Sequence, residues 1–177
     1  MQKWMRYFFI IYLLLVVKFI IFKYPYEQLP AMEQLFAGMQ GWSKNVIRDG
    51  LAAANFIPLK TIRMYIKYAD RLNSFENLAG NILIFVPFGI LLPMMGGRKK
   101  GFADVLLGAL VLVLGIELFQ LFTSFGVFDV DDIILNCLGA VLGYFCYVLY
   151  RIKRNRFPVD RETEKVGDLG GKYFKEN

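Results

Sequence analysis

Histidine is absent from this chain of 177 residues, and cysteine occurs only twice. The lack of histidine excludes histidine-based acid–base catalysis, histidine nucleophiles and histidine metal ligands. Both cysteines, Cys137 and Cys146, lie within one apolar block, which excludes a disulfide framework and a zinc site. The sequence therefore predicts no resident metal and no cofactor.

Charge is scarce in four long blocks, at about residues 4–22, 78–95, 102–122 and 130–150. The apolar fraction is 56% and the mean hydropathy is +0.43, above the roughly 45–50% apolar content of ordinary soluble proteins. At about 1.5 Å per residue, each block approaches the roughly 30 Å core of a bilayer. These blocks predict an all-α integral membrane four-helix bundle over residues 1–150, followed by a basic, disordered tail at 151–177.

Lysine and arginine are missing between Gly101 and Arg151 and frequent on either side of that stretch. Basic residues in short loops mark the cytoplasmic side of a membrane protein. We therefore expect both termini to be cytoplasmic, the first block to be an uncleaved anchor, and the segment 23–77 to be external.

The external segment contains a predicted amphipathic helix, Lys60–Leu72. Its basic residues are spaced 3, 4 and 4, which places them on one helical face: Lys60, Arg63, Lys67 and Arg71. Ile62 and Ile66 lie on another face. The pattern is typical of a helix in the membrane interface. Its cations either anchor it to lipid phosphates or attract an anionic ligand.

Polar side chains recur at one depth of the predicted bundle. They come from the external ends of three helices: Asn77, Asn81, Glu117, Gln120, Asp129, Asp132 and Asn136. Counted at about 1.5 Å per residue, all lie within roughly 10 Å of the external surface. Because polar groups within a bilayer usually face the bundle interior or a wet cavity, these residues predict one ligand-binding layer.

A structural role is the alternative for this layer. Interhelical hydrogen bonds between amides contribute about 0.6 kcal/mol each and suit Asn and Gln. Glu117 and Asp132 fit that role poorly, because a charge inside a bilayer is costly. A proton or an external hard cation such as Ca²⁺ or Mg²⁺ would neutralise them. In the same helices, Gly139-Ala-Val-Leu-Gly143 predicts close helix packing, and Pro87 predicts a kink.

Three motifs resemble the VanZ-like family of bacterial membrane proteins. They are Asn77-x3-Asn81-Ile-Leu-Ile-Phe-Val-Pro87-Phe-Gly89, Glu117-Leu-Phe-Gln120 and Phe128-Asp129-Val-Asp-Asp132-Ile-Ile-Leu-Asn136-Cys-Leu-Gly139. Upstream, Asn55-Phe-Ile-Pro58 is similar to the family's Asn-x-x-Pro element. The similarity covers about residues 7–150 and departs at Ser124-Phe-Gly126-Val, where relatives often carry an arginine before the Asp pair.

The resemblance implies a multi-pass protein of the bacterial cell membrane with a cell-envelope role, because the founding member is associated with teicoplanin resistance. We expect a non-enzymatic protein that binds an amphiphile at the outer leaflet. The polar layer would hold the head of the amphiphile, and the basic helix its anionic group. The expected partners are membrane lipids and a lipid-linked envelope precursor or a lipoglycopeptide, and not nucleic acid.

Two other functions stay open at this stage. A membrane-embedded hydrolase or transferase would use Glu117 or Asp132 as general acid or base, although no serine or cysteine nucleophile motif accompanies them. A small transporter would need several copies, because four helices are few for a transport path. The sequence does not give the oligomeric state.

Overall fold

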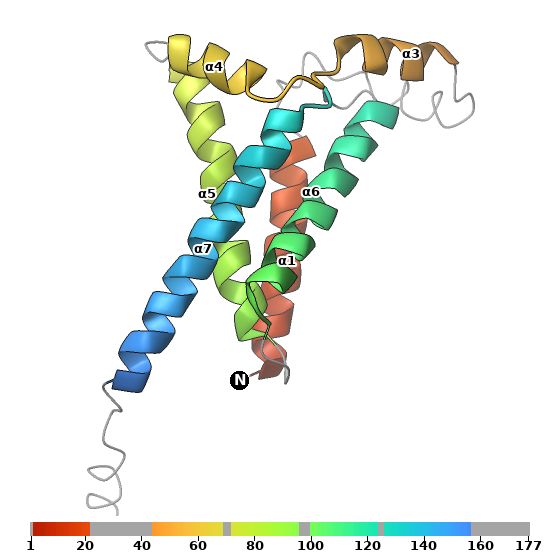
Figure 1. Cartoon of the computed structure of the whole chain (residues 1–177). Coiled ribbons are helices and arrows are strands. Elements are labelled where there is room, and N and C mark those ends of the chain that lie inside the picture. Colours follow the sequence, from red (N-terminus) through yellow and green to blue (C-terminus); the bar gives the residue numbers. More distant parts are fainter. Residues whose placement is uncertain (1, 22–43, 69–71, 96–99, 124–125, 157–177) are drawn as a thin grey trace, which may run out of the picture.

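The computed structural model describes residues 2–21, 44–68, 72–95, 100–123 and 126–156, and these form six α-helices and no strand. The helices are α1 (Gln2–Ile21), α3 (Lys44–Ala53), α4 (Lys60–Lys67), α5 (Leu72–Met94), α6 (Phe102–Thr123) and α7 (Val130–Arg156). The four long helices pack together, and α3 and α4 lie across one end of them (Figure 1). The predicted all-α class is confirmed.

Two long helices extend beyond their predicted bounds. α5 begins at Leu72 and not at residue 78, because its first turns carry polar residues that a search for apolar blocks leaves out. α7 continues to Arg156 instead of ending at residue 150. Residues 151–156 are therefore helical and not part of a disordered tail, since Lys and Arg are good helix formers and are favourable at a helix C-terminus. Residues 157–177 lie outside the described part of the chain, as do residues 22–43 of the segment expected to be external.

The predicted interfacial helix Lys60–Leu72 is shorter in the structure. α4 ends at Lys67, after which the Tyr68 N–H donates to the Met64 carbonyl oxygen at 3.1 Å. Leu72 already belongs to α5. Upstream of α4, the helix α3 was not predicted, because its ten residues contain no long apolar run.

Three glycines bring the backbones of α5 and α7 into contact. A Cβ on Gly139 or on Gly143 would lie 2.0 Å from a backbone carbonyl oxygen of α5, and a Cβ on Gly89 would lie 2.0 Å from the Ala140 carbonyl oxygen. Any larger residue at these positions would push the two helices apart. The Gly139–Gly143 pattern thus marks a close helix contact within the chain, as small residues do in membrane bundles.

α6 and α1 complete the core around two aromatic rings of α5. α6 contributes Val105, Ala109 and Val113, which are four residues apart and at most 1% exposed. Phe85 is fully buried, and the ring of Phe9 from α1 lies 5.7 Å from that of Phe88, centroid to centroid. The core therefore contains side chains from all four long helices, because Ala140 of α7 joins the same cluster.

Two hydrogen bonds from side chains fasten α1 to its neighbours at different depths. The Tyr12 hydroxyl donates to the Ile84 carbonyl oxygen of α5 at 2.5 Å, and Gln120 Nε2 of α6 donates to the Ile20 carbonyl oxygen at 3.3 Å. Pro87 has no N–H to donate to the Leu83 carbonyl oxygen, which directly precedes Ile84 in α5.

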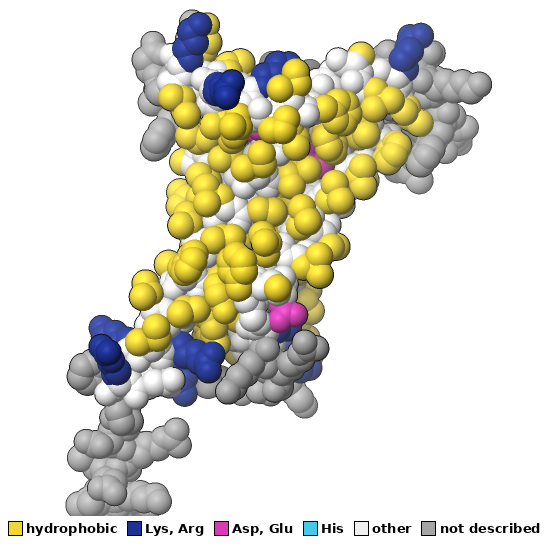
Figure 2. Space-filling view, in the orientation of Figure 1, with side chains coloured by type: hydrophobic (Ala, Val, Ile, Leu, Met, Phe, Trp, Pro, Cys, Tyr) yellow, Lys and Arg dark blue, Asp and Glu magenta, His cyan; other side chains and the backbone are white. Residues whose placement is uncertain are grey.

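The outer surface of the long helices is apolar. Leu83, Val111 and Leu149 come from three different helices and are 65%, 64% and 66% exposed. Figure 2 shows hydrophobic side chains between Lys and Arg side chains at the two ends of the molecule. Three described segments are long and apolar enough to cross a membrane: Glu76–Met94, Phe102–Phe122 and Val130–Arg156. An apolar exterior around buried polar groups is what a bilayer requires.

Candidate functional site

Two segments that precede helices pair with each other at the α3–α4 end of the bundle. The Asn55 N–H donates to the Phe128 carbonyl oxygen at 2.8 Å, and the Val130 N–H donates to the Asn55 carbonyl oxygen at 3.0 Å. Asn55 and Asp129 thereby form an isolated parallel β-bridge. The Asn55 side chain also accepts the Ile57 N–H at 3.1 Å, which turns the chain toward α4. The Asn-x-x-Pro element therefore contacts the Asp-rich element directly.

Asp131 holds the amino terminus of α4. The N-cap of that helix is Leu59, whose side chain cannot cap and whose φ of 66° lies in the left-handed region. Asp131 accepts the N–H groups of Leu59, of Thr61 at 2.7 Å and of Ile62 at 3.1 Å. Its carboxylate is 0% exposed. A negative charge here satisfies the free N–H groups of the first turn and complements the helix dipole.

Asp129 connects the amino terminus of α4 to α6 and α7 through hydrogen bonds. Its Oδ1 accepts from Asn55 Nδ2 and from the Asp131 N–H, both at 2.8 Å. The bond from Asp131 is an N-cap of α7. Its Oδ2 accepts from the Thr61 hydroxyl at 2.6 Å, and its own N–H donates to Glu117 Oε2 at 2.9 Å. We refer to Asn55, Thr61, Glu117, Asp129 and Asp131 as the α4 clamp.

Glu117, one of the two predicted acid–base candidates, is fully enclosed in this clamp. Its exposed fraction is 0%, and one carboxylate oxygen accepts a backbone N–H. A general acid or base must come within hydrogen-bond reach of its substrate. The position of Glu117 therefore favours a role in holding the start of α7 over a role in catalysis.

Asp132, the other acid–base candidate, lies in a separate contact between α5 and α7. Its Oδ1 accepts from Asn81 Nδ2. One turn further along α7, Asn136 donates from Nδ2 to the Asp132 carbonyl oxygen at 2.7 Å. Asn136 is 1% exposed, and within the described part of the chain its Oδ1 has no hydrogen-bond partner. The predicted residues Asn81, Asp132 and Asn136 thus form one group at the α5–α7 contact.

Gln120 is hydrogen-bonded to α1. Its amide donates to the Ile20 carbonyl oxygen of α1 at 3.3 Å, and its side chain packs against Gly126. A Cβ on Gly126 would lie 2.6 Å from Gln120 Nε2. A residue larger than glycine at this position would therefore displace the Gln120 side chain. Ser124 and Phe125 are outside the described residues.

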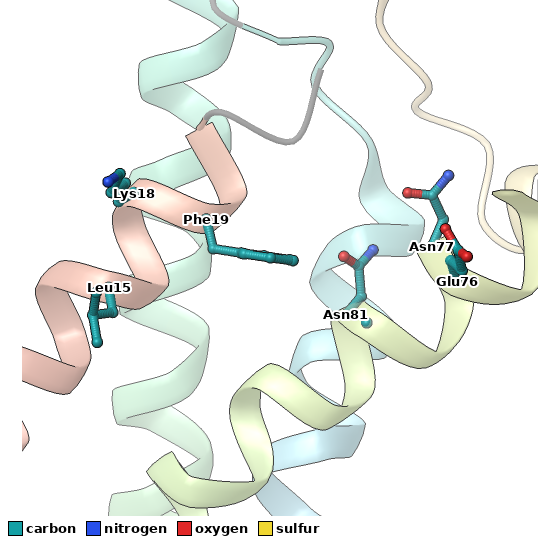
Figure 3. Close-up of a pocket in the computed structure, with 7 residues that line it drawn as sticks. Leu15, Lys18, Phe19, Glu76, Asn77 and Asn81 are labelled. Atoms are coloured by element: carbon teal, nitrogen blue, oxygen red, sulfur yellow. The ribbon is translucent and has the colours of Figure 1, made fainter. Parts of the chain in front are cut away.

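A groove of about 590 Å³ lies between the last turns of α1 and the first turns of α5 (Figure 3). In Figure 3 the ring of Phe19 projects from α1 toward Asn81. The described lining residues are Leu15, Lys18, Phe19, Glu76, Asn77, Gly80 and Asn81. The lining combines apolar surface, two amides and side chains of both charge signs. Among the predicted site residues, Asn77 and Asn81 line this groove.

The basic residues of α4 do not line the groove. Lys60, Arg63 and Lys67 are exposed, and Arg71 lies outside the described residues. Tyr65 lies on the opposite side of α4. Burial raises the pKa of Tyr65 above its ordinary value, and the charges of Asp132 and Asp129 raise it further. α4 therefore directs its phenol toward the acidic residues and its cations away from them.

Sequence reasoning omitted Asp131, because it lies off the helical face shared by Asp129, Asp132 and Asn136. The sequence nevertheless indicates that α4 needs a capping residue from another segment. Leu59 offers no capping side chain before α4, and a helix without its own N-cap needs acceptors from elsewhere. The omitted groove residues of α1 gave a weaker signal, because α1 is apolar on most of its faces.

Several carboxylates gather at this end of the molecule. Within the described ranges, no group of three or more His, Cys, Asp or Glu side chains is placed to hold a metal ion. In the α4 clamp, backbone N–H groups, the Asn55 amide and the Thr61 hydroxyl supply the donors to the carboxylates.

Together these features define an α-helical membrane protein whose Asp-rich element orders the helices at one end of the bundle. The family model described as VanZ/LLP1 matches residues 9–151. The chain belongs to the VanZ/LLP1 family, as the resemblance of its motifs predicted. It is 34% identical over 96 residues to Protein VanZ of Enterococcus faecium, a match that covers 54% of this chain and 59% of that protein. No solved structure gives a significant match.

Proposed function

We propose that this protein binds an amphiphile of the outer leaflet in the groove between α1 and α5. The lining of the groove is the observation that carries the proposal. Leu15 and Phe19 provide apolar surface for a tail, and Glu76, Asn77 and Asn81 provide polar groups for a head. A volume of about 590 Å³ and a mostly apolar lining with a few polar groups are typical of small-molecule sites.

The proposal includes a membrane orientation. α1 serves as a fourth span, because its 20 residues reach about 30 Å and it lies beside the other long helices (Figure 1). The basic end of α7, at the opposite end of the molecule from α4, faces the cytoplasm. Both termini are then cytoplasmic, and the groove opens near the outer surface of the bacterial cell membrane.

The ligand class follows from the lining and from the family. An acyl tail beside a polar head describes lipid-linked envelope precursors and lipoglycopeptides of the teicoplanin type. The relative is named Protein VanZ, and the resemblance links that name to teicoplanin resistance. We infer that this chain acts in the cell envelope by binding such a molecule.

Binding is better supported than hydrolysis or group transfer. Neither Glu117 nor Asp132 lines the groove, and Glu117 is 0% exposed. Asp132 is connected to the groove indirectly, because Asn81 lines the groove and donates a hydrogen bond to Asp132. Asp132 thus orients a groove residue without reaching the ligand.

The paired changes Glu76→Gln and Asn77→Leu test the proposal, because they alter the polar lining at two positions for which the structure gives no side-chain hydrogen bond to another described residue. We expect a bacterium that expresses this variant to lose any protection against a teicoplanin-type lipoglycopeptide, while the thermal midpoint of the purified protein stays unchanged. Asp104→Asn, at the other end of the molecule, is the control. A variant that protects as well as the wild type, at equal expression, contradicts the groove as the binding site.

A further inference from the structure

The helices α3 and α4 and the segment between them form a layer across one end of the bundle (Figure 1). We refer to residues 44–67 as the α3–α4 layer. It exposes an unusual number of large apolar side chains. Their exposed fractions are 47% for Leu51, 54% for Phe56, 61% for Ile57, 43% for Leu59, 49% for Met64 and 63% for Ile66. In water such a surface would favour association, so it requires an apolar environment.

The same layer carries exposed basic side chains on its outer side. Lys60, Arg63 and Lys67 share one face of α4 and lie opposite Thr61, whose hydroxyl points into the α4 clamp. Arg48 of α3 is also exposed. Figure 2 shows Lys and Arg side chains along the outer rim of the layer, with hydrophobic side chains between this rim and the rest of the bundle. The cationic groups therefore border the apolar groups of the layer on the outer side, with Met64 between Lys60 and Lys67 on the basic face.

The α4 clamp fixes this arrangement. Asp131 holds the start of α4, and the bridge between Asn55 and Asp129 holds the segment before it. Phe56 packs against Phe128, with ring centroids 5.1 Å apart, yet remains 54% exposed. The apolar side chains of the segment are thus held outward, and they cannot turn into the core without breaking the clamp.

We propose that the α3–α4 layer is a binding surface for anionic phospholipids of the leaflet at that end of the bundle. The apolar side chains enter the boundary between headgroups and acyl chains, and the four basic residues contact lipid phosphates. Charge complementarity supports this partner, and so does continuity, because the apolar side chains of the layer adjoin the hydrophobic surface of the long helices (Figure 2).

The basic residues of α4 determine how strongly the layer should prefer anionic lipid. A basic residue near an anionic lipid surface contributes about 1 kcal/mol, or about fivefold in affinity. Neutralising Lys60, Arg63 and Lys67 together should therefore reduce the preference for anionic over zwitterionic lipid by about a hundredfold. The apolar contacts remain in that variant, so the layer should lose its lipid preference before it loses all contact with the bilayer.

The experiment uses the full chain with both native cysteines replaced by alanine and Ile57→Cys or Ile66→Cys carrying an environment-sensitive fluorophore. The protein is reconstituted in phosphatidylcholine vesicles with increasing phosphatidylglycerol. Quenching by brominated lipid reports contact with the bilayer, and quenching by iodide reports contact with water. Lys60→Gln/Arg63→Gln/Lys67→Gln is compared with Arg151→Gln/Lys153→Gln/Arg154→Gln, which removes three basic residues at the opposite end.

We expect brominated phosphatidylglycerol to quench the fluorophore much more than brominated phosphatidylcholine does, and only the α4 variant to lose this difference. Three results would overturn the proposal. They are quenching by iodide as in water, equal quenching by both brominated lipids in the wild type, and energy transfer between labelled copies together with protection from both quenchers. The last result would show that a second copy of the chain covers the layer. Unchanged thermal midpoints verify that each variant is folded.

Discussion

Replacing Asp131 with asparagine should release the amino terminus of α4. Asparagine keeps the shape of the side chain but replaces one acceptor oxygen with an NH₂ group. In one orientation this group faces the N–H groups of Thr61 and Ile62, which lie 2.7 Å and 3.1 Å from the wild-type oxygen. In the flipped orientation it faces the N–H of Leu59. Either way at least one charge-assisted hydrogen bond becomes a contact between two donors.

The expected loss of stability follows from the hydrogen bonds that Asp131 accepts from α4. A hydrogen bond to a charged group contributes about 1.5–3 kcal/mol, so the loss of one or two should lower the free energy of unfolding by about 1.5–6 kcal/mol. For a chain of this size, each kcal/mol shifts the thermal midpoint by about 2–4 °C. The midpoint of the Asp131→Asn variant should therefore fall by roughly 3–24 °C.

The assay combines thermal unfolding of the full chain in detergent with limited trypsin digestion, which cuts after the exposed Lys60, Arg63 and Lys67 when α4 detaches. Asp104→Asn is the matched control, because Asp104 is an exposed carboxylate that accepts one backbone N–H, from Gly101 at 2.8 Å. Its midpoint should move by less than about 2 °C. An Asp131→Asn protein that melts like the wild type and is cut in α4 at the same rate would refute the α4 clamp.

Three further changes test other parts of the structure. Gly143→Ala should lower the thermal midpoint strongly, because its Cβ would lie 2.0 Å from the Val86 carbonyl oxygen, whereas Gly115→Ala meets no atom within 4 Å and should not; equal midpoints would contradict the close α5–α7 contact. Leu59→Gly should leave the midpoint unchanged or raise it, because a φ of 66° costs a residue with a Cβ about 1–2 kcal/mol; a large fall would show that its packing outweighs the strain. Tyr65 has a raised pKa in the folded state, so its contribution to stability is full below about pH 10 and is lost as the pH rises through the folded pKa. Tyr65→Phe should therefore weaken the alkaline loss of stability, and identical midpoint–pH profiles would exclude this effect.

Sequence patterns were sufficient for the long helices, because lipid-facing helices must be apolar over their whole length. The patterns did not predict the ends of the helices, because residues there do not have to be apolar. Leu72 and the polar turn that follows it belong to α5, yet they look like loop in a hydropathy scan. α3 shows no apolar block, and the basic spacing that predicted a helix from Lys60 continues past the end of α4 at Lys67.

The candidate site was predictable in residue type but not in grouping. Depth along the helices placed Glu117, Gln120 and Asp132 in one layer, and in the structure each has a different hydrogen-bond partner: the Asp129 N–H for Glu117, the Ile20 carbonyl oxygen for Gln120 and the Asn81 amide for Asp132. Depth alone could not distinguish them, because it does not say which neighbour each helix face meets. The groove was not predictable for the same reason, since it depends on how α1 packs beside α5.

The central claim is that the groove between α1 and α5 holds an amphiphile, and cross-linking tests it most directly. A photoreactive residue replaces Phe19 in the groove, or Val111 as a control on the exposed surface of α6, where the side chain is 64% exposed. After irradiation of bacterial membranes, mass spectrometry identifies the molecules attached to the full-length protein. The account predicts an envelope amphiphile that is enriched at position 19 over position 111 and is lost from position 19 in the Glu76→Gln/Asn77→Leu variant. The same mixture of bulk lipids at both positions, unaffected by that variant, would contradict it.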